Sequence, residues 1–263
     1  MSKLSISNIG WTKEQDQEVY YLMKKYGFSG LEIAPTRVFP EMPYDRLHEA
    51  KEWSAHLKQE YGFCVPSMQS IWYGRKEKIF GTEGEFHTLI KYTKRAIDFA
   101  SVIGCRNLVF GCPGNRSIPE GTDPLIGIRF FREIGNYAAL RGTVIGMEAN
   151  PMIYNTNYIN DTVSAFELIK QVNSEGFKLN LDVGTMIQND EKADALVGRV
   201  HLIQHVHISE PWLKPIEERK LHQELKEVLS DEGYHGFISI EMGREVDLKI
   251  LENKMVYVKG VFA

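Results

Sequence analysis

Four side chains of the types that bind metals and move protons stand at the ends of four apolar stretches in the second half of the chain. The stretches read GMEANP, LNLDVG, HVHISE and ISIEMG, and the side chains are Glu148, Asp182, His207 and Glu241. Three carboxylates in one dry pocket would repel each other, and a divalent cation removes that conflict. Carboxylate oxygens with one imidazole suit Mn²⁺, Mg²⁺ or Co²⁺. We therefore predict that these four residues bind one divalent metal ion, with Mn²⁺ the first expectation and Mg²⁺, Co²⁺ or Zn²⁺ as alternatives.

The stretch QHVHISE holds a second histidine, His205, two residues before His207. Side chains two apart on a strand share a face, so the residues two before each predicted ligand face the same interior, one layer down. Those residues are Gly146, Asn180, His205 and Ser239. We predict that Asn180, His205 and Ser239 orient the metal ligands from below through hydrogen bonds. A core histidine with ordinary partners is the alternative for His205.

These ligands converge only if several strands end at one place. At six places in the sequence a helix-like segment ends in glycine and a strand-like run follows. Successive places are roughly 35 residues apart, which is the length of one strand-plus-helix unit. Strands are expected at residues 3–8, 31–34, 64–70, 107–111, 144–148, 178–182, 202–208 and 237–241. This rhythm predicts one (β/α)₈ TIM barrel over residues 1–263, with active-site groups at the carboxyl ends of the strands. A doubly wound open sheet is less favoured, because NIGWTKE rather than a glycine-rich fingerprint follows the first strand.

The chain has 263 residues, which is enough for one large α/β domain. Its 43% of hydrophobic residues and its formal net charge of −4 are ordinary for a globular protein. No long basic run exists, so a nucleic-acid partner is not expected. Cys64, Cys105 and Cys112 are odd in number and lack zinc-like spacing, which favours reduced thiols. Neither a signal peptide nor a membrane-spanning stretch is visible. We expect a cytoplasmic protein without a membrane partner, whose oligomeric state stays open, homo-oligomers included.

The order of the four motifs resembles the sugar phosphate isomerase/epimerase superfamily with its xylose-isomerase-like TIM barrel. The likeness runs from GLEIAP to ISIEMG, across almost the whole chain. The resemblance implies one divalent metal on Glu148, Asp182, His207 and Glu241, with the two glutamates moving protons on opposite faces of the substrate. It implies an isomerase or epimerase of a small sugar, ketose or keto-polyol that works through a metal-stabilised enediolate.

Other positions depart from that family. Thr185 replaces a histidine that contacts substrate in the epimerases, Tyr154 replaces a glutamate, and Leu213 with Lys214 replaces an arginine. The predicted metal ligands are therefore intact, whereas the substrate contacts differ. An inosose-dehydratase-like lyase on the same barrel is the alternative. An endonuclease IV-like hydrolase is less favoured, because Gln69 and Phe110 stand where it would need histidines, and a non-catalytic barrel is the remaining alternative.

Polar and aromatic residues near the strand ends are expected to contact a small carbohydrate substrate. The loop after residues 64–70 supplies an amide and an aromatic platform, and the glycine- and proline-rich loop FGCPGNRSIPEG supplies an arginine for a phosphate or carboxylate. Structural roles are the alternatives: a solvated or paired carboxylate for Glu32, a buried anchor for the aromatic residues Trp72 and Tyr73, and surface charges for Arg116 and Glu210. The predicted substrate contacts are Glu32, Gln69, Trp72, Asn115, Arg116, Asn150, Thr185, Glu210 and Lys214.

Overall fold

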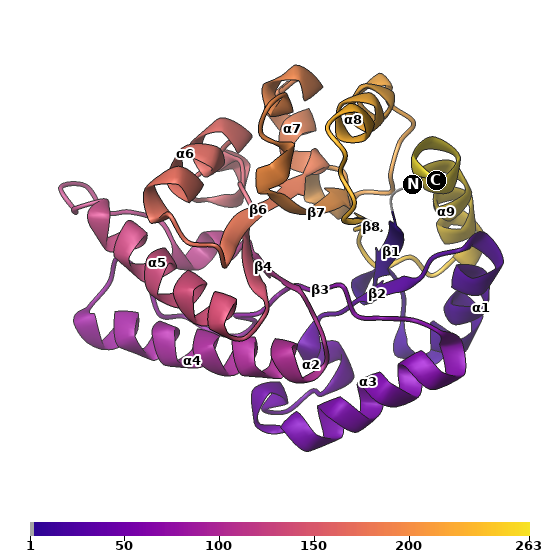
Figure 1. The fold of residues 1–263 in the computed structure, drawn as a ribbon, viewed down its shortest axis with the longest axis horizontal. Helices are drawn as coiled ribbons and strands as arrows, with labels where there is room; N and C mark the ends of the chain where they lie inside the picture. Colours follow the sequence, from indigo (N-terminus) through magenta and orange to yellow (C-terminus); the bar gives the residue numbers. More distant parts are fainter. Residues whose placement is uncertain (1–2) are drawn as a thin grey trace.

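Eight parallel strands form the centre of the molecule in the computed structural model, which describes residues 3–263 (Figure 1). Neighbouring strands pair in the order β2-β1-β8-β7-β6-β5-β4-β3, and isolated bridges from Gly30 to Cys64 and from Ile33 to Met68 join β2 to β3. The nearly closed ring confirms the predicted (β/α)₈ TIM barrel. The strands are β1 (Lys3–Ser7), β2 (Gly30–Glu32), β3 (Ser67–Met68), β4 (Asn107–Phe110), β5 (Val144–Met147), β6 (Phe177–Asp182), β7 (Ile203–Ile208) and β8 (Phe237–Ile240).

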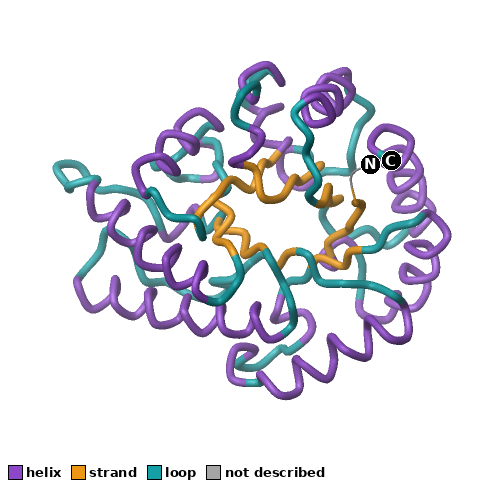
Figure 2. The backbone as a smooth tube through the Cα atoms, in the orientation of Figure 1, coloured by secondary structure: helices purple, strands orange, loops and turns teal. Residues whose placement is uncertain are grey.

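Helices surround the strands on the outside of the barrel (Figure 2). Glycine ends two of them as expected, because Gly27 and Gly62 take the left-handed conformation, with φ of 78° and 77°, directly after α1 and α3. The helices are α1 (Asp16–Tyr26), α2 (Pro35–Val38), α3 (Leu47–Tyr61), α4 (Glu83–Val102), α5 (Leu125–Leu140), α6 (Thr162–Val172), α7 (Val183–Gln188), α8 (Lys220–Asp231) and α9 (Leu248–Phe262).

The strand bounds follow the sequence closely except at β3, where residues 64–70 were expected and Ser67–Met68 are observed. The backbone explains the difference. Pro66 has no N–H to donate to a neighbouring strand, and Ser70 has a φ of 55°, which turns the chain out of the sheet. The loop that follows β3 is therefore set by this turn rather than by strand pairing.

The hydrophobic core lies between the barrel and the helix ring. Phe110 of β4 packs edge to face on Phe131 of α5 at 4.9 Å between ring centroids, and Phe130 packs on Phe131 at 5.4 Å. Such aromatic pairs contribute about 0.5–1.5 kcal/mol beyond the burial of their area. Each helix turns one apolar face inward, as Val19 and Met23 of α1 show.

The inside of the barrel is unusually polar, since branched apolar residues commonly fill that space. Asn107 Nδ2 donates hydrogen bonds to Ser67 Oγ at 3.0 Å and to Asn180 Oδ1 at 3.2 Å. Gly146 leaves room for this network, because a Cβ there would lie 2.4 Å from Asn107 Oδ1. Ser239 is also buried here. These polar residues form the floor on which the candidate site rests.

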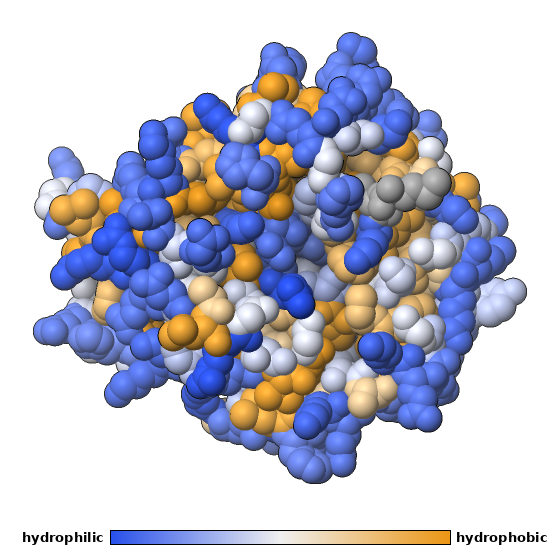
Figure 3. Space-filling model, in the orientation of Figure 1, coloured by the Kyte–Doolittle hydropathy of each residue, from blue (hydrophilic) through white to orange (hydrophobic). Residues whose placement is uncertain are grey.

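On the face seen in Figure 1 the surface is mostly hydrophilic, with hydrophobic residues scattered between (Figure 3). No helix within residues 3–263 is long and apolar enough to cross a membrane. The three cysteines are free thiols, in agreement with the prediction.

Candidate metal centre

The structure brings together the four residues that the sequence proposes as metal ligands. Glu148 directly follows β5, Asp182 ends β6, His207 lies in β7 and Glu241 directly follows β8. The parallel register places Asp182 beside His207. One oxygen or nitrogen atom of each residue lies within 4.8 Å of the corresponding atoms of the others. The carboxyl ends of four consecutive strands thus deliver one compact group of ligands, which we call the outer group.

His207 is the centre of the outer group. Its Nδ1 lies 3.2 Å from Glu148 Oε1 and 3.1 Å from Glu241 Oε2, and its ring is fully buried. Burial lowers the pKa of His207, but the charges of Glu241 and Glu32 outweigh burial and raise that pKa well above its ordinary value. The imidazole is therefore held firmly between carboxylates on both of its edges.

The carboxylates of the outer group are crowded. Burial raises the pKa of Glu241 to about 7. Burial, with the charge of Glu148 next, also raises the pKa of Asp182. Three acids facing one imidazole carry excess negative charge, and oxygen-rich donors of this kind suit a hard divalent cation. The residues present therefore fit a divalent metal ion.

Asp182 is fixed by its own helix start. Its Oδ2 accepts a hydrogen bond from the Thr185 backbone N–H at 2.7 Å, so it caps α7. Thr185 Oγ1 lies 2.8 Å from both Asp182 Oδ2 and the Ala149 carbonyl and shares its proton between them. Ser209 Oγ donates to Asp182 Oδ1. Thr185 was expected to contact substrate, and the structure shows that it is buried and orients Asp182.

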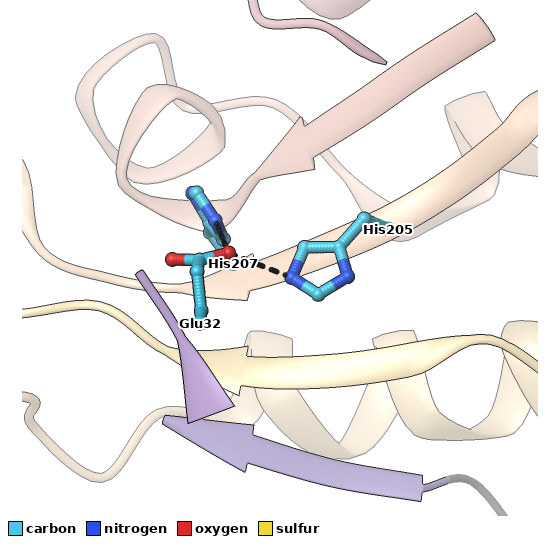
Figure 4. Close-up of side chains that lie close together, drawn as sticks. All are labelled: Glu32, His205 and His207. Atoms are coloured by element: carbon cyan, nitrogen blue, oxygen red, sulfur yellow. Dashed lines mark hydrogen bonds and ion pairs between the residues drawn. The ribbon is translucent and has the colours of Figure 1, made fainter. Parts of the chain in front are cut away.

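Glu32 lies beneath the outer group rather than at its opening, which contradicts the expected substrate contact. The side chain is fully buried, and its Oε2 lies 2.9 Å from His207 Nε2 and 3.0 Å from His205 Nε2 (Figure 4). Only the contact with His207 has the direction of a hydrogen bond. Burial raises the pKa of Glu32, but the two imidazoles, His207 first, hold it well below its ordinary value. The paired-carboxylate alternative therefore describes Glu32.

This contact decides which nitrogen of His207 is free for a metal. If Nε2 carries the proton and donates it to Glu32, the lone pair of Nδ1 points into the outer group. Glu32, His205 and His207 also lie close enough together to hold an ion themselves, and we call them the inner group. His207 thus belongs to both groups, with one nitrogen on each side.

The three residues predicted to support the ligands from below differ in what they contact. Asn180 Nδ2 donates to Glu148 Oε1 at 2.9 Å and lies 3.3 Å from His207 Nδ1, so it touches two ligands. His205 acts one step away, through Glu32. The Ser239 hydroxyl is buried without a hydrogen-bond partner among the described residues.

Comparison with known proteins identifies the family of this barrel. A family model described as a xylose isomerase-like TIM barrel matches residues 20–259. The chain belongs to the xylose isomerase-like TIM barrel family. The resemblance stated from the four motifs is thereby confirmed. No curated protein matches the chain in sequence.

Several solved structures share the fold of this xylose isomerase-like barrel at low sequence identity. The 3-keto-D-glucoside 4-epimerase YcjR from E. coli is 20% identical, with a TM-score of 0.79 over 99% of this chain and 100% of that one. D-psicose 3-epimerase from Clostridium cellulolyticum H10 is 17% identical, with a TM-score of 0.77 over 98% and 99%. An AP endonuclease of family 2 from Brucella melitensis is 19% identical, with a TM-score of 0.73 over 100% of both chains.

Two predicted substrate contacts of this xylose isomerase-like barrel lie directly against the outer group. Gln69 Nε2 donates to Glu241 Oε1 at 3.0 Å and to Ser7 Oγ at 3.1 Å. Asn150 Nδ2 donates to Glu148 Oε2 at 3.2 Å. Each of these two amides therefore holds one of the glutamates, in addition to the bond from Asn180 to Glu148.

Arg116 is neither a surface charge nor exposed to a substrate. Its side chain is fully buried, with Nη1 donating to the Glu148 carbonyl at 2.8 Å and Nη2 to Asn150 Oδ1 at 3.0 Å. Burial lowers the pKa of Arg116 to about 10. The guanidinium instead braces the segment that carries Glu148. Its neighbour Asn115 donates to the carbonyls of Arg75 and Glu77, so it holds the loop together.

The remaining predicted contacts, all within residues 3–263, make no hydrogen bond or ion pair with the four proposed ligands. Trp72 is buried between β4 and the helices, where its ring packs on Phe110 and its Nε1 donates to Thr93 Oγ1 at 2.9 Å, so the buried-anchor alternative describes it. Glu210 is buried and makes a two-pronged ion pair with Arg219, at 2.7 and 2.6 Å, so it is not a surface charge. Lys214 is exposed.

Sequence reasoning missed an aromatic pair near the outer group. Tyr154 Oη accepts a hydrogen bond from the Trp212 backbone N–H at 2.8 Å, and the two rings lie 5.0 Å apart. Burial raises the pKa of Tyr154, and the negative charges of Asp182, Glu148 and Glu241 add to this rise. The sequence did hold a sign that Tyr154 has its own role, because it stands where the resembled epimerases have a glutamate.

Proposed function

We propose that this protein is a metal-dependent isomerase or epimerase of a small sugar, ketose or keto-polyol. One observation carries the proposal: three carboxylates and one buried imidazole converge at the carboxyl ends of β5 to β8. That edge is where barrels of this type place their reactive groups. The epimerase names of the structural neighbours YcjR and D-psicose 3-epimerase support the same class of reaction.

Glu148, Asp182, Glu241 and Nδ1 of His207 would hold one divalent cation, for which Mn²⁺ is our first choice, ahead of Mg²⁺, Co²⁺ and Zn²⁺. A bound cation would polarise the substrate's ketone and stabilise the negative charge that develops when a neighbouring C–H proton leaves. The Thr185 backbone N–H and the Ser209 hydroxyl hold the Asp182 carboxylate in place. It is thus suited to holding rather than to proton transfer.

Glu148 and Glu241 are the proposed acid/base pair. They approach the centre from different strands, and each is oriented by an amide, Asn150 on one side and Gln69 on the other. One glutamate removes the proton beside the ketone as general base. The other returns a proton to the opposite face, which gives epimerisation. Return of the proton to the neighbouring carbon gives aldose–ketose isomerisation with the same residues.

Solvent hydrogen exchange tests this proposal. The Mn²⁺-loaded protein is incubated in D₂O with a panel of ketoses, keto-inositols and keto-glycosides, and deuterium at carbon is measured by NMR. We expect exchange with at least one substrate class, and loss of at least about 100-fold of the exchange rate in Glu148→Gln and in Glu241→Gln. The exposed Glu120→Gln is the matched control and should exchange at the wild-type rate.

The same experiment separates the alternatives. Loss of water from the product would identify an inosose-dehydratase-like lyase, because proton abstraction is common to both reactions. Exchange that survives in both glutamine variants would overturn the proposed acid/base pair. A cytoplasmic location, a homo-oligomer and the lack of a nucleic-acid partner stay predictions.

A further inference from the structure

The loop after β7 holds an indole ring out in solvent. Trp212 is 59% exposed. Ser209, three residues earlier in the chain, is buried. Trp212 and Leu213 have φ angles of 63° and 52°, in the left-handed region that residues with a Cβ rarely adopt. Such backbone strain persists only where the surrounding structure imposes it, and it is concentrated at ligand-binding positions.

The strained loop is held at both ends. The Leu213 N–H donates to the Glu210 carbonyl at 2.9 Å, and the Leu213 carbonyl accepts from the Gly243 N–H at 2.7 Å. Glu210 itself is tied to Arg219 by the two-pronged ion pair. Trp212 is therefore displayed by a fixed frame, and its exposure is not a consequence of a loose loop.

Tyr154 adds a polar group beside the indole. It comes from the loop after β5, and its ring meets Trp212 at an angle of 64°, so the two rings form a corner. Because Tyr154 Oη accepts the Trp212 N–H, its own hydroxyl proton is free to be donated, and no acceptor for it is found within residues 3–263. The strands β5 and β7 flank β6, which carries Asp182, so the corner stands beside the outer group.

We propose that Tyr154 and Trp212 form a subsite for a sugar ring that lies outside the reacting carbons, so that the substrate is a glycoside or disaccharide rather than a free open-chain ketose. This rests on the proposed function. A pyranose ring has one face of C–H groups and a rim of hydroxyls. The indole face matches the first, and the phenol donor matches the second. An open-chain polyol offers no flat face, and a purely apolar ligand would not use the donor.

Fluorescence tests the subsite without any reaction. Of the tryptophans in the described residues, Trp11 and Trp72 are buried and Trp53 is half-buried, so acrylamide quenches Trp212 preferentially. With the Mg²⁺-loaded protein, we expect methyl β-D-glucopyranoside to protect this fluorescence and sorbitol to have no effect. Trp212→Ala should abolish the protected component, and Tyr154→Phe should weaken methyl glucoside binding about tenfold. Equal protection by sorbitol, or no protection at saturation, would overturn the proposal.

Exchange kinetics separate the subsite from the proposed function. In D₂O, Trp212→Ala should lower kcat/KM for a keto-glycoside about tenfold and leave a free ketose within twofold. The control Tyr21→Ala removes an exposed aromatic ring from α1 and should change neither. Equal losses on both substrates would reject the subsite while the function stands. Protection by methyl glucoside without exchange on any substrate would reject the function while the subsite stands.

A second copy of the chain is the rival occupant of this corner. If light scattering showed a wild-type dimer that Trp212→Ala dissociates, the indole would be a subunit contact and the subsite proposal would be wrong. We expect the two proteins to have the same mass in solution.

Discussion

Two groups of side chains share the imidazole of His207, one on each nitrogen. The outer group lies at Nδ1 and contains Glu148, Asp182 and Glu241, whereas the inner group lies at Nε2 and contains Glu32 and His205. Both are compact enough to hold an ion. The Glu148 and Glu241 side chains keep 13% and 11% of their surface exposed, whereas Glu32 keeps 0% and His205 keeps 2%.

The difference between the groups is one of charge balance. In the inner group a single carboxylate faces two imidazoles, and its pKa is held well below the ordinary value, so the charge is already compensated. In the outer group three carboxylates face one imidazole, and burial raises the pKa of both Asp182 and Glu241. Compactness alone therefore does not identify a metal site. Because the outer group carries an excess of negative charge and keeps access to solvent, we propose that the cation binds there and not in the inner group.

The largest effect is expected from removing the shared imidazole. His207→Ala deletes one proposed metal ligand and leaves Glu32 with one partner fewer, and breaking a buried pair costs about 3–5 kcal/mol. We expect loss of Mn²⁺ binding by titration calorimetry and a correspondingly lower free energy of unfolding in urea for the metal-free protein. The exposed His201→Ala is the control. Wild-type Mn²⁺ affinity in His207→Ala would refute the shared role.

A smaller effect is expected from Glu32→Gln. The carboxylate 2.9 Å from His207 Nε2 is replaced by an amide, which favours a proton on that nitrogen less strongly and so no longer keeps Nδ1 free for the metal. Changes of such orienting partners typically weaken metal binding about 10–100-fold. Titration with Mn²⁺ measures the effect, with exposed Glu167→Gln alongside. A loss as complete as that of His207→Ala would mean that Glu32 binds the ion directly.

His205→Ala should separate stability from metal binding. It removes a buried neighbour of Glu32 but leaves the hydrogen bond between Glu32 and His207 intact. We expect the free energy of unfolding to fall by about 1–3 kcal/mol, with Mn²⁺ affinity reduced less than in Glu32→Gln. Urea denaturation and calorimetry give the two values. Equal losses of Mn²⁺ affinity in His205→Ala and His207→Ala would contradict the division into two groups.

The smallest effect concerns Thr185, which supports one outer ligand through a hydroxyl. Thr185→Val keeps the shape and the backbone N–H that caps Asp182, and it removes a hydrogen bond of about 1 kcal/mol. Mn²⁺ affinity should fall only a few-fold. The exposed Thr88→Val, which loses a hydroxyl bond to a helix carbonyl, should bind Mn²⁺ like the wild type. An unchanged affinity in Thr185→Val would mean that the backbone N–H alone positions Asp182.

The outer group could be predicted from the sequence because it depends on short-range rules. Glu148, Asp182, His207 and Glu241 end apolar strands, and the ends of parallel strands meet. Glu32 ends a strand in the same way, yet its side chain is fully buried and contacts His205 and His207 instead of joining the other carboxylates. Which neighbours a strand-end side chain meets depends on packing between strands, which side-chain alternation does not reveal.

Loop residues were harder to place, because their direction depends on turns. The left-handed Ser70 sends Trp72 toward α4 instead of toward the ligands. Arg116 sits in a loop of glycine and proline, and its burial follows from carbonyls supplied by segments far along the chain. Residue type alone therefore predicts the chemistry available, whereas long-range packing decides which side chains reach the site.

The position of a bound ion tests the assignment most directly. Crystals grown with Mn²⁺ should show one anomalous scattering peak per chain, at coordinating distance from Glu148, Asp182, Glu241 and Nδ1 of His207, with none beside Glu32. A peak between Glu32 and His205, or no peak at saturating Mn²⁺, would contradict the account.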